Sequence, residues 1–421
     1  MTASPARTGR DDAGVAAVSR IVGPVGIPGA TPPGLFAVAP APTGNVAFTT
    51  GGDGLVGWGE HARLTVSGPD AAQRIGDWFA GVVAELDVSD EVQMPGSGPI
   101  AFVSLGFDDR DESVAVVPSV VLGRREGVTF RTALGTPGLL EPTPIRSPGR
   151  ISYADASLSV AGFISAVAGA VARIRRGELA KVVLAHDLEA TAGRAVDERF
   201  LLSGLAAAYP TCWTFAVAGL IGASPEMLIR RMGRQLSSRV LAGTAWAEHA
   251  RDRVADALMS SSKDLAEHAF AVASVVDVLA GVVEQLEVPE HPHPLPLSNL
   301  THLATDLTGT LAPGGPTALE LAARLHPTAA VGGTPSRVAQ AVIRELEPLP
   351  RGRYAAPVGW LDAAGDGEFA IALRCAQITG RSVRLLAGCG VVADSDPETE
   401  AREAQVKMVP VRDALESAVT E

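Results

Sequence analysis

Two acidic clusters in the sequence combine residue types and spacings that could bind a cation. Glu400, Glu403 and Lys407 stand at positions i, i+3 and i+7, so on a helix their two carboxylates and one ammonium share a face. Glu267 belongs to a second cluster, residues 263–268, which lies inside a long helical pattern. Each cluster alone is typical of a solvated helix face with ordinary salt bridges. If the two helices meet in a pocket, the glutamates supply hard oxygen donors of the kind that Mg²⁺ prefers.

Glycine-rich strand ends and two isolated charged residues are further candidates. Glycines such as Gly243 and Gly388 let backbone N–H groups approach an anion closely, although at a strand end they usually mark only a turn. Lys181 opens an apolar strand, where a lysine is most often an edge residue with its stem along apolar surface. Glu226 stands just ahead of another apolar run. The residue types alone leave both interpretations open at each of these positions.

The composition limits the class of partner and the compartment. With 421 residues, 47% of them hydrophobic, the chain is long enough for one large domain with an ample core. The net charge of −12 and the absence of long basic runs argue against a nucleic-acid partner. Three cysteines at spacings that match neither a zinc pair nor a disulfide framework favour a reducing cytoplasm. Residues 1–14 lack an apolar signal segment, and the apolar stretches 160–172 and 270–286 are too short or too charged to span a bilayer.

The predicted elements place these candidates on a mixed framework. Residues 1–45, rich in Pro and Gly, are predicted to be a loose lead-in, and 289–296 a surface loop. Helical spacing predicts helices over residues 163–174, 199–209, 253–286 and 397–419. Alternation and turn residues predict strands over 100–105, 114–122, 127–133, 181–188, 354–361, 368–378 and 382–392.

Ten segments, taken together and in order, resemble one known enzyme family. They are Lys181-Val182-Val183-Leu184, Ser224-Pro225-Glu226, Leu241-Ala242-Gly243-Thr244, Lys263-Asp264-Leu265-Ala266-Glu267-His268, His326-Pro327-Thr328-Ala329-Ala330, Arg351-Gly352-Arg353-Tyr354, Gly365-Asp366-Gly367-Glu368-Phe369, Arg374, the turn at Gly388, and Glu400 with Glu403 and Lys407. Their order is similar to that of the chorismate-utilising enzymes, strongly over residues 150–421 and loosely before. The resemblance implies one large α/β (α+β) domain of the anthranilate synthase component I type over residues 46–421, with stacked, mainly antiparallel sheets flanked by helices.

The resemblance also implies roles for individual residues. Glu267 and Glu403 are the expected ligands of a Mg²⁺ cofactor, with Glu400 close by or acting through water. Lys181 is the expected general base that activates water, and Glu226 the matching general acid. The substrate, chorismate, is expected to contact Gly243, Thr244, Ala330, Tyr354, Arg374, Gly388 and Lys407. Of these, Arg374 would hold a carboxylate by its fork and Gly388 by its backbone N–H.

Single positions that differ among members of this family favour isochorismate synthase activity. Lys181 resembles the members that use water rather than ammonia, and water attack at ring C2 with loss of the C4 hydroxyl to Glu226 would give isochorismate. Ala242 stands where aminodeoxychorismate synthases carry a nucleophilic lysine. Ala330 stands where salicylate synthases typically carry threonine. Salicylate synthase, which eliminates pyruvate in the same site, is the alternative.

Two further alternatives fit the sequence less well. An ammonia-using subunit would require a glutaminase partner, and Lys181 argues against it, so we expect no such subunit and a monomer. A non-catalytic chorismate-binding protein would have lost an essential group, whereas the expected acid, base and metal ligands are all present. His186 and Ala404 depart from the arginine and threonine common in the family.

Overall fold

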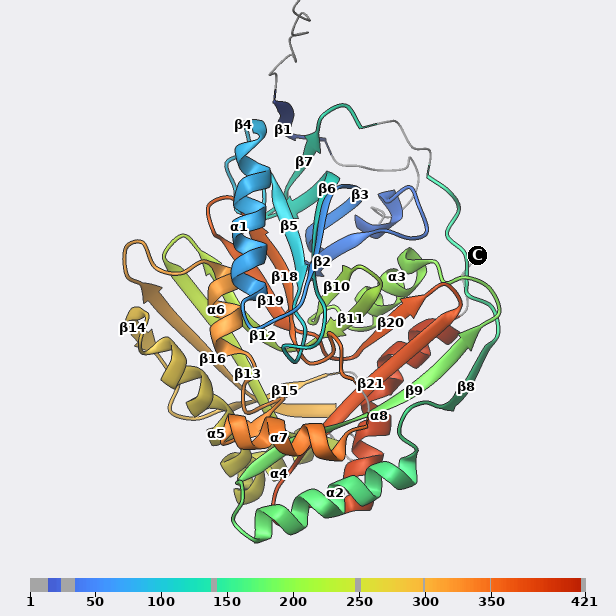
Figure 1. The fold of residues 1–421 in the computed structure, drawn as a ribbon, viewed down its shortest axis with the longest axis vertical. Coiled ribbons are helices and arrows are strands. Elements are labelled where there is room, and N and C mark those ends of the chain that lie inside the picture. The colour runs from blue at the N-terminus through green and yellow to red at the C-terminus, as the bar shows by residue number, and fades with distance from the viewer. Residues whose placement is uncertain are drawn as a thin grey trace, which may run out of the picture.

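The computed structural model describes residues 14–23, 35–137, 142–246, 251–297, 300–348 and 350–417. Within them, 21 strands form one continuous hydrogen-bonded network, and eight α-helices surround it (Figure 1). Apart from the parallel pairing of β1 (Val15–Ile21) with β4 (Leu86–Asp90), the ladders between the described strands are antiparallel. The predicted fold class, a mainly antiparallel α/β fold flanked by helices, is confirmed.

The network divides at β6 (Ser113–Arg125) into two arms, and β7 (Val128–Leu134) joins β6 to β1. One arm runs through β3 (Asp53–Val66), β2 (Val46–Thr50), β10 (Trp213–Val217), β11 (Leu220–Ser224), β20 (Cys375–Thr379), β21 (Ser382–Val391) and β9 (Lys181–Ala192) to β8 (Ile151–Asp155) and β17 (Gly333–Thr334). The other runs through β5 (Ile100–Ser104), β18 (Pro357–Asp362), β19 (Gly367–Ile371), β12 (Met227–Met232), β13 (Gln235–Trp246) and β16 (Leu300–Leu311) to β14 (Val283–Glu287) and β15 (His293–Pro296).

The helices are α1 (Ala71–Ala84), α2 (Val160–Arg175), α3 (Glu198–Ala208), α4 (Arg251–Ser260), α5 (Ser262–Leu279), α6 (Ala318–Leu325), α7 (Ser336–Leu346) and α8 (Pro397–Glu416), with a short 3-10 helix at Leu35–Val38. Two of them matter most for the site, because α5 packs on β13 and α8 packs on β21. Ser261 caps α5 by accepting from the Asp264 N–H, and Asp396 caps α8 by accepting from the Thr399 N–H. The caps fix where the acidic faces of both helices begin.

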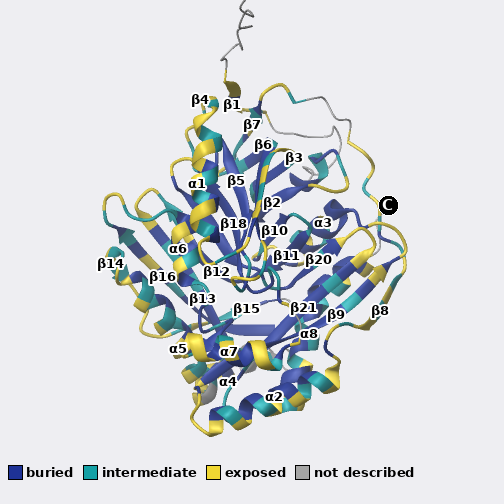
Figure 2. Ribbon diagram, viewed as in Figure 1, coloured by how far each residue is buried: buried dark blue, intermediate teal, exposed yellow. Residues whose placement is uncertain are grey.

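Buried residues follow the central strands, and exposed residues lie on the outer faces of α1, α2, α6 and α7 (Figure 2). The alternating and continuous apolar runs of the strands supply this core, with Phe48, Phe102, Phe215 and Trp360 among its largest fully buried side chains. No helix in the described part of the chain is long and apolar enough to cross a membrane.

The predicted element boundaries are wrong in three places. The helix predicted over 253–286 is two helices that separate at Ser261, followed by the strand β14, because the Ser261 hydroxyl caps a new helix inside the periodic run. The strand predicted over 368–378 is divided into β19 and β20 around Arg374, whose φ of 50° is incompatible with an extended strand. Part of the predicted loop 289–296 is the strand β15, which pairs with β16.

The predicted lead-in contains ordered elements. Within residues 1–45, β1 pairs with both β4 and β7, and the 3-10 helix at Leu35–Val38 contributes Leu35 and Phe36 to the core. Residues 1–13 and 24–34 of this segment lie outside the described residues.

Candidate active site

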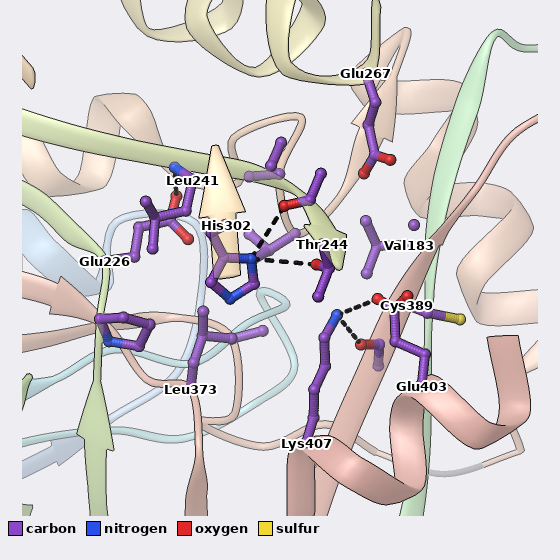
Figure 3. Close-up of a pocket in the computed structure, with 18 of the residues that line it drawn as sticks. Val183, Glu226, Leu241, Thr244, Glu267, His302, Leu373, Cys389, Glu403 and Lys407 are labelled. Carbon is purple, nitrogen blue, oxygen red and sulfur yellow. Dashed lines mark hydrogen bonds and ion pairs between the residues drawn. The ribbon is translucent and has the colours of Figure 1, made fainter. Parts of the chain in front are cut away.

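One pocket collects almost all of the predicted site residues, at the place where the ends of the two sheet arms meet (Figure 3). Strands β13 and β16 contribute from one arm, β9 and β21 from the other, α5 and α8 from the helices, and Glu226 from the turn before β12. Eleven of the predicted residues line it: Glu226, Gly243, Thr244, Glu267, Ala330, Tyr354, Arg374, Gly388, Glu400, Glu403 and Lys407. Lys181 is the exception, because it lies behind the lining residue Glu267.

Lys181 is fully buried and forms an ion pair with Glu267. Its Nζ lies 2.9 Å from Glu267 Oε1, and the two side chains are 0% and 14% exposed. Gly390 on β21 makes room for the pair, since a Cβ there would come within 2.6 Å of Glu267 Oε1 and 3.1 Å of Lys181 Cε. The sequence pattern is typical of a lysine at a strand edge. Lys181 is instead buried, and the Glu267 carboxylate from α5 neutralises its charge there.

Glu226 lies on the other side of the pocket from Glu267 (Figure 3) and is 4% exposed. Burial raises the pKa of its carboxyl to about 8, against the opposing effects of the Leu241 backbone N–H, which donates to Oε1, and of the positive charge of Lys181. At neutral pH the carboxyl holds its proton. Glu226 can therefore donate a proton to a leaving group in the pocket.

His302 on β16 connects three of the predicted substrate-binding residues, and it was not itself among the residues predicted from the sequence. Its Nε2 accepts from Arg374 Nη2 at 3.1 Å. Its Nδ1 lies 3.1 Å from Thr244 Oγ1 and 3.2 Å from the Gly243 carbonyl (Figure 3). Burial and the nearby charge of Arg374 hold the pKa of His302 well below its usual range, so the ring is neutral. A single histidine in an alternating apolar strand gives no signal of this role.

Three residues that line the pocket, Gly243, Ala355 and Arg374, have positive φ angles. Gly243, with φ of 78°, sits at a bulge in the β13–β16 ladder, which turns its carbonyl and the neighbouring Thr244 towards His302. Arg374 and Ala355 adopt φ of 50° and 61°, values rarely tolerated outside glycine, and both line the pocket. Burial raises the pKa of the Tyr354 hydroxyl, next to Ala355, so it stays a neutral hydrogen-bond donor.

Carboxylates from two helices line the pocket. Glu267 and Asp264 come from α5, and Glu400 and Glu403 from α8. Asp264 appeared in the predicted cluster but was assigned no role. Lys407 Nζ donates to Glu403 Oε1 at 2.6 Å and to the Gly388 carbonyl at 3.1 Å. The Gly388 N–H was predicted to bind a carboxylate of the substrate. The carbonyl of the same residue accepts a hydrogen bond from Lys407.

These donors fit a magnesium ion. In the described part of the chain, no three Asp, Glu, His or Cys side chains are close enough to form a complete cage. Mg²⁺ commonly takes only one or two carboxylates and fills its other positions with water or substrate oxygens. Glu267 on α5 and Glu403 on α8 line the same pocket and could supply two such carboxylates.

The two departures from the family pattern lie beside the pocket. His186 on β9 accepts at Nε2 from Gln405 Nε2 at 2.7 Å and contacts the Leu158 carbonyl through Nδ1 at 3.0 Å. Ala404 is fully buried in the core under α8. His186 thereby ties α8 to β9, and neither residue lines the pocket.

The chain is similar to known proteins over most of this region. A family model described as "Chorismate binding enzyme" matches residues 141–416. The chain is 42% identical over 253 residues to isochorismate synthase DhbC of Bacillus subtilis, a stretch that covers 56% of this chain and 63% of the relative. It is 39% identical over 254 residues to isochorismate synthase EntC of Escherichia coli K12, covering 58% of this chain and 65% of the relative. The matched stretch thus spans just under two thirds of both relatives.

Solved structures extend the likeness to nearly the whole chain. The DhbC protein of Bacillus anthracis superposes with a TM-score of 0.76 at 29% identity, covering 90% of this chain and 98% of that one. MenF, the menaquinone-specific isochorismate synthase of Escherichia coli, gives a TM-score of 0.78 at 23% identity over 96% and 95% of the two chains, which shows a shared fold.

Proposed function

The chain belongs to the chorismate-binding enzyme family, and we propose that it is an isochorismate synthase that isomerises chorismate to isochorismate. The observation that carries this proposal is the placement of a protonated carboxyl, Glu226, across one pocket from the Lys181–Glu267 ion pair. The relatives named isochorismate synthase support the same reaction. An acid and a base on opposite sides of a ring suit the exchange of one hydroxyl for another.

In the proposed mechanism, Lys181 acts as the neutral amine, after the ammonium of the ion pair has released its proton to solvent, and it takes a proton from a water molecule whose oxygen bonds to ring C2. The ring double bond shifts, the C4–O bond breaks, and Glu226 gives its proton to the departing hydroxyl, so that one water enters and one leaves. Glu267, 2.9 Å from Lys181 Nζ, stabilises the ammonium that forms on the lysine. Because one hydroxyl replaces another, we expect the reaction to be reversible.

Arg374, Tyr354, Thr244 and Lys407 are proposed to hold the two carboxylates of chorismate, with Ala330 and Val331 against the ring. A chain of net charge −12 needs local positive groups to bind a dianion, and Arg374 and Lys407 supply them in this pocket. Charge-assisted hydrogen bonds from a guanidinium are suited to a carboxylate.

Glu267 and Glu403, with Glu400 close by, would hold Mg²⁺, which when bound supplies positive charge against a substrate carboxylate. We further propose that residues 46–421 act as one catalytic domain, that the protein works in the cytoplasm as a monomer, and that it needs no glutaminase subunit. The apolar Ala330 is proposed to stop the reaction at isochorismate, before pyruvate is lost.

The test is to incubate the purified protein with chorismate and Mg²⁺ and to separate the products by chromatography. We expect isochorismate alone; accumulation of salicylate and pyruvate would instead assign the chain to the salicylate synthases. Lys181→Ala and Glu226→Gln are assayed beside the wild type. Normal turnover by both variants would refute the roles assigned to the base and the acid.

A further inference from the structure

Arg351 and Glu347 form a buried ion pair behind the wall of the pocket. Arg351 Nε donates to Glu347 Oε2 at 2.9 Å and Nη2 donates to Oε1 at 2.5 Å, and both side chains are 2% exposed. Glu347 follows the last turn of α7, and Arg351 begins the segment that ends at the pocket residue Tyr354. Neither Arg351 nor Glu347 lines the pocket, and the proposed mechanism uses neither.

The pair is hydrogen-bonded to two segments that do line the pocket. Arg351 Nη2 donates to the Val183 carbonyl at 2.7 Å, and Nη1 donates to the Val331 carbonyl at 3.0 Å. Val183 lies on β9 and Val331 in the loop before β17, and both line the pocket. One guanidinium therefore bridges two walls of the cavity.

The same pair completes the edge of β9. The short strand β17 pairs with β9 only at Lys181 and Val182, and β8 joins β9 at Leu188 and beyond. Between them, Glu347 Oε1 accepts from the Ala185 N–H at 2.7 Å, and Arg351 donates to the Val183 carbonyl. The two side chains thus satisfy backbone groups that a neighbouring strand would otherwise bond, and a buried backbone group without a partner is costly.

We propose that the Glu347–Arg351 pair is a positioning device that holds the strand of Lys181 and the loop of Ala330 and Val331 at a fixed separation across the pocket. The inference rests on the proposed function, since it concerns the placement of the general base of that reaction. Lys181 lies two residues before Val183, so a shift of β9 at Val183 moves the amine. Lysine in place of Arg351 keeps the charge but lacks the planar fork that reaches two carbonyls and one carboxylate together.

The test compares Arg351→Lys with a matched control, Arg199→Lys. Arg199 also forms a buried pair, with Asp197 at 2.7 Å, and donates to the Ala39 and Thr143 carbonyls. It does not line the pocket, and its hydrogen bonds within the described residues do not reach β9. We expect Arg351→Lys to lower kcat by about tenfold or more, with KM for chorismate within about threefold, because a displaced general base slows the chemical step more than it weakens substrate binding. We expect Arg199→Lys to lower the melting temperature comparably and to leave kcat unchanged.

Hydrogen exchange of the peptide that covers 181–188 gives a readout independent of turnover. The Ala185 amide should exchange faster in Arg351→Lys than in Arg199→Lys. Glu347→Gln retains an acceptor oxygen for that amide, and should keep more turnover and more protection than Glu347→Leu. If Arg351→Lys does not fold, the difference in turnover and exchange between Glu347→Gln and Glu347→Leu tests the inference instead.

Two results would overturn the inference: a kcat of Arg351→Lys equal to that of Arg199→Lys at similar stability, or unchanged exchange at Ala185. A wild type that does not convert chorismate would instead refute the proposed function, while the exchange measurement still reports whether the pair holds β9.

Discussion

The Lys181 ammonium lies 2.9 Å from the Glu267 carboxylate, and the pair is packed under Gly390, where no side chain intervenes. A lysine buried completely would be costly without such a partner. Because Glu267 is also a proposed ligand of Mg²⁺, the base and the metal site share one carboxylate. Gly390 lies on β21 and Glu267 on α5, so a change in the spacing of these two elements would affect both the general base and the proposed metal ligand.

Gly390→Ala is predicted to separate the pair. The added Cβ would lie 2.6 Å from Glu267 Oε1 and 3.1 Å from Lys181 Cε, so one of the two side chains has to move. We expect turnover to fall by about tenfold or more and stability to fall by about 1–3 kcal/mol, the usual cost of overpacking. Steady-state kinetics and thermal unfolding measure the two effects.

Gly76→Ala is the control for this substitution. Gly76 lies in α1, where an added Cβ meets nothing within 4 Å, so the variant should keep normal turnover and gain about 0.5–1 kcal/mol from helix propensity. Wild-type kinetics in Gly390→Ala would show that the Lys181–Glu267 contact is not needed for turnover.

Glu226→Gln is predicted to reduce kcat by about 10²–10⁴-fold, the usual contribution of a general acid, with little change in chorismate affinity. In the wild type, the acid form is populated below the raised pKa of about 8. We therefore expect kcat to fall as the pH rises through about 8. A kcat that is flat from pH 6 to pH 10 would exclude Glu226 as the proton donor.

The sequence allowed the acidic helix faces to be predicted, because helical spacing by itself places Glu400, Glu403 and Lys407 together. Eleven predicted residues line the pocket for a different reason, since the order of the family motifs identifies positions that folding brings together. The family prediction is confirmed by the match over residues 141–416. The individual roles stay predictions, which the variants described here test.

The burial of Lys181 and the role of His302 could not be predicted from local pattern. A lysine at the start of a strand is usually at an edge, and its burial here depends on Glu267 from a helix far along the chain. His302 acquires its role only when β13 and β16 pair and Arg374 turns back at positive φ. The break at Ser261 was missed because one apolar periodicity continues across it.

His302→Asn is predicted to raise KM for chorismate by about tenfold while changing kcat less, because loss of a hydrogen bond that orients Arg374 weakens ground-state binding of a carboxylate. His293→Asn, at an exposed position on β15, is the control and should behave as the wild type. An unchanged KM in His302→Asn would mean that Arg374 does not depend on the histidine.

Glu403→Gln is predicted to raise the Mg²⁺ concentration needed for half-maximal activity by about tenfold or more, since a carboxylate ligand is replaced by a neutral amide. Chelation of Mg²⁺ should abolish wild-type activity, and added Mg²⁺ should restore it. Titration calorimetry of Mg²⁺ checks the affinity without turnover. Glu398→Gln removes the same charge from an exposed position on α8 and should leave the affinity unchanged; an equal loss in both variants would indicate a general charge effect.

Glu226 should also make folding depend on pH. Burial raises its pKa from 4.5 to about 8 in the folded protein, so between these values the folded state keeps a proton that the unfolded chain has released. The unfolded state then binds fewer protons, and the free energy of unfolding falls as the pH rises through this window and levels off above it. Glu226→Gln has no proton to lose, so its stability relative to the wild type should increase from pH 5 to pH 8. Chemical denaturation at several pH values measures this difference, and a constant difference would show that the folded carboxyl is already ionised at neutral pH and is unable to act as the acid.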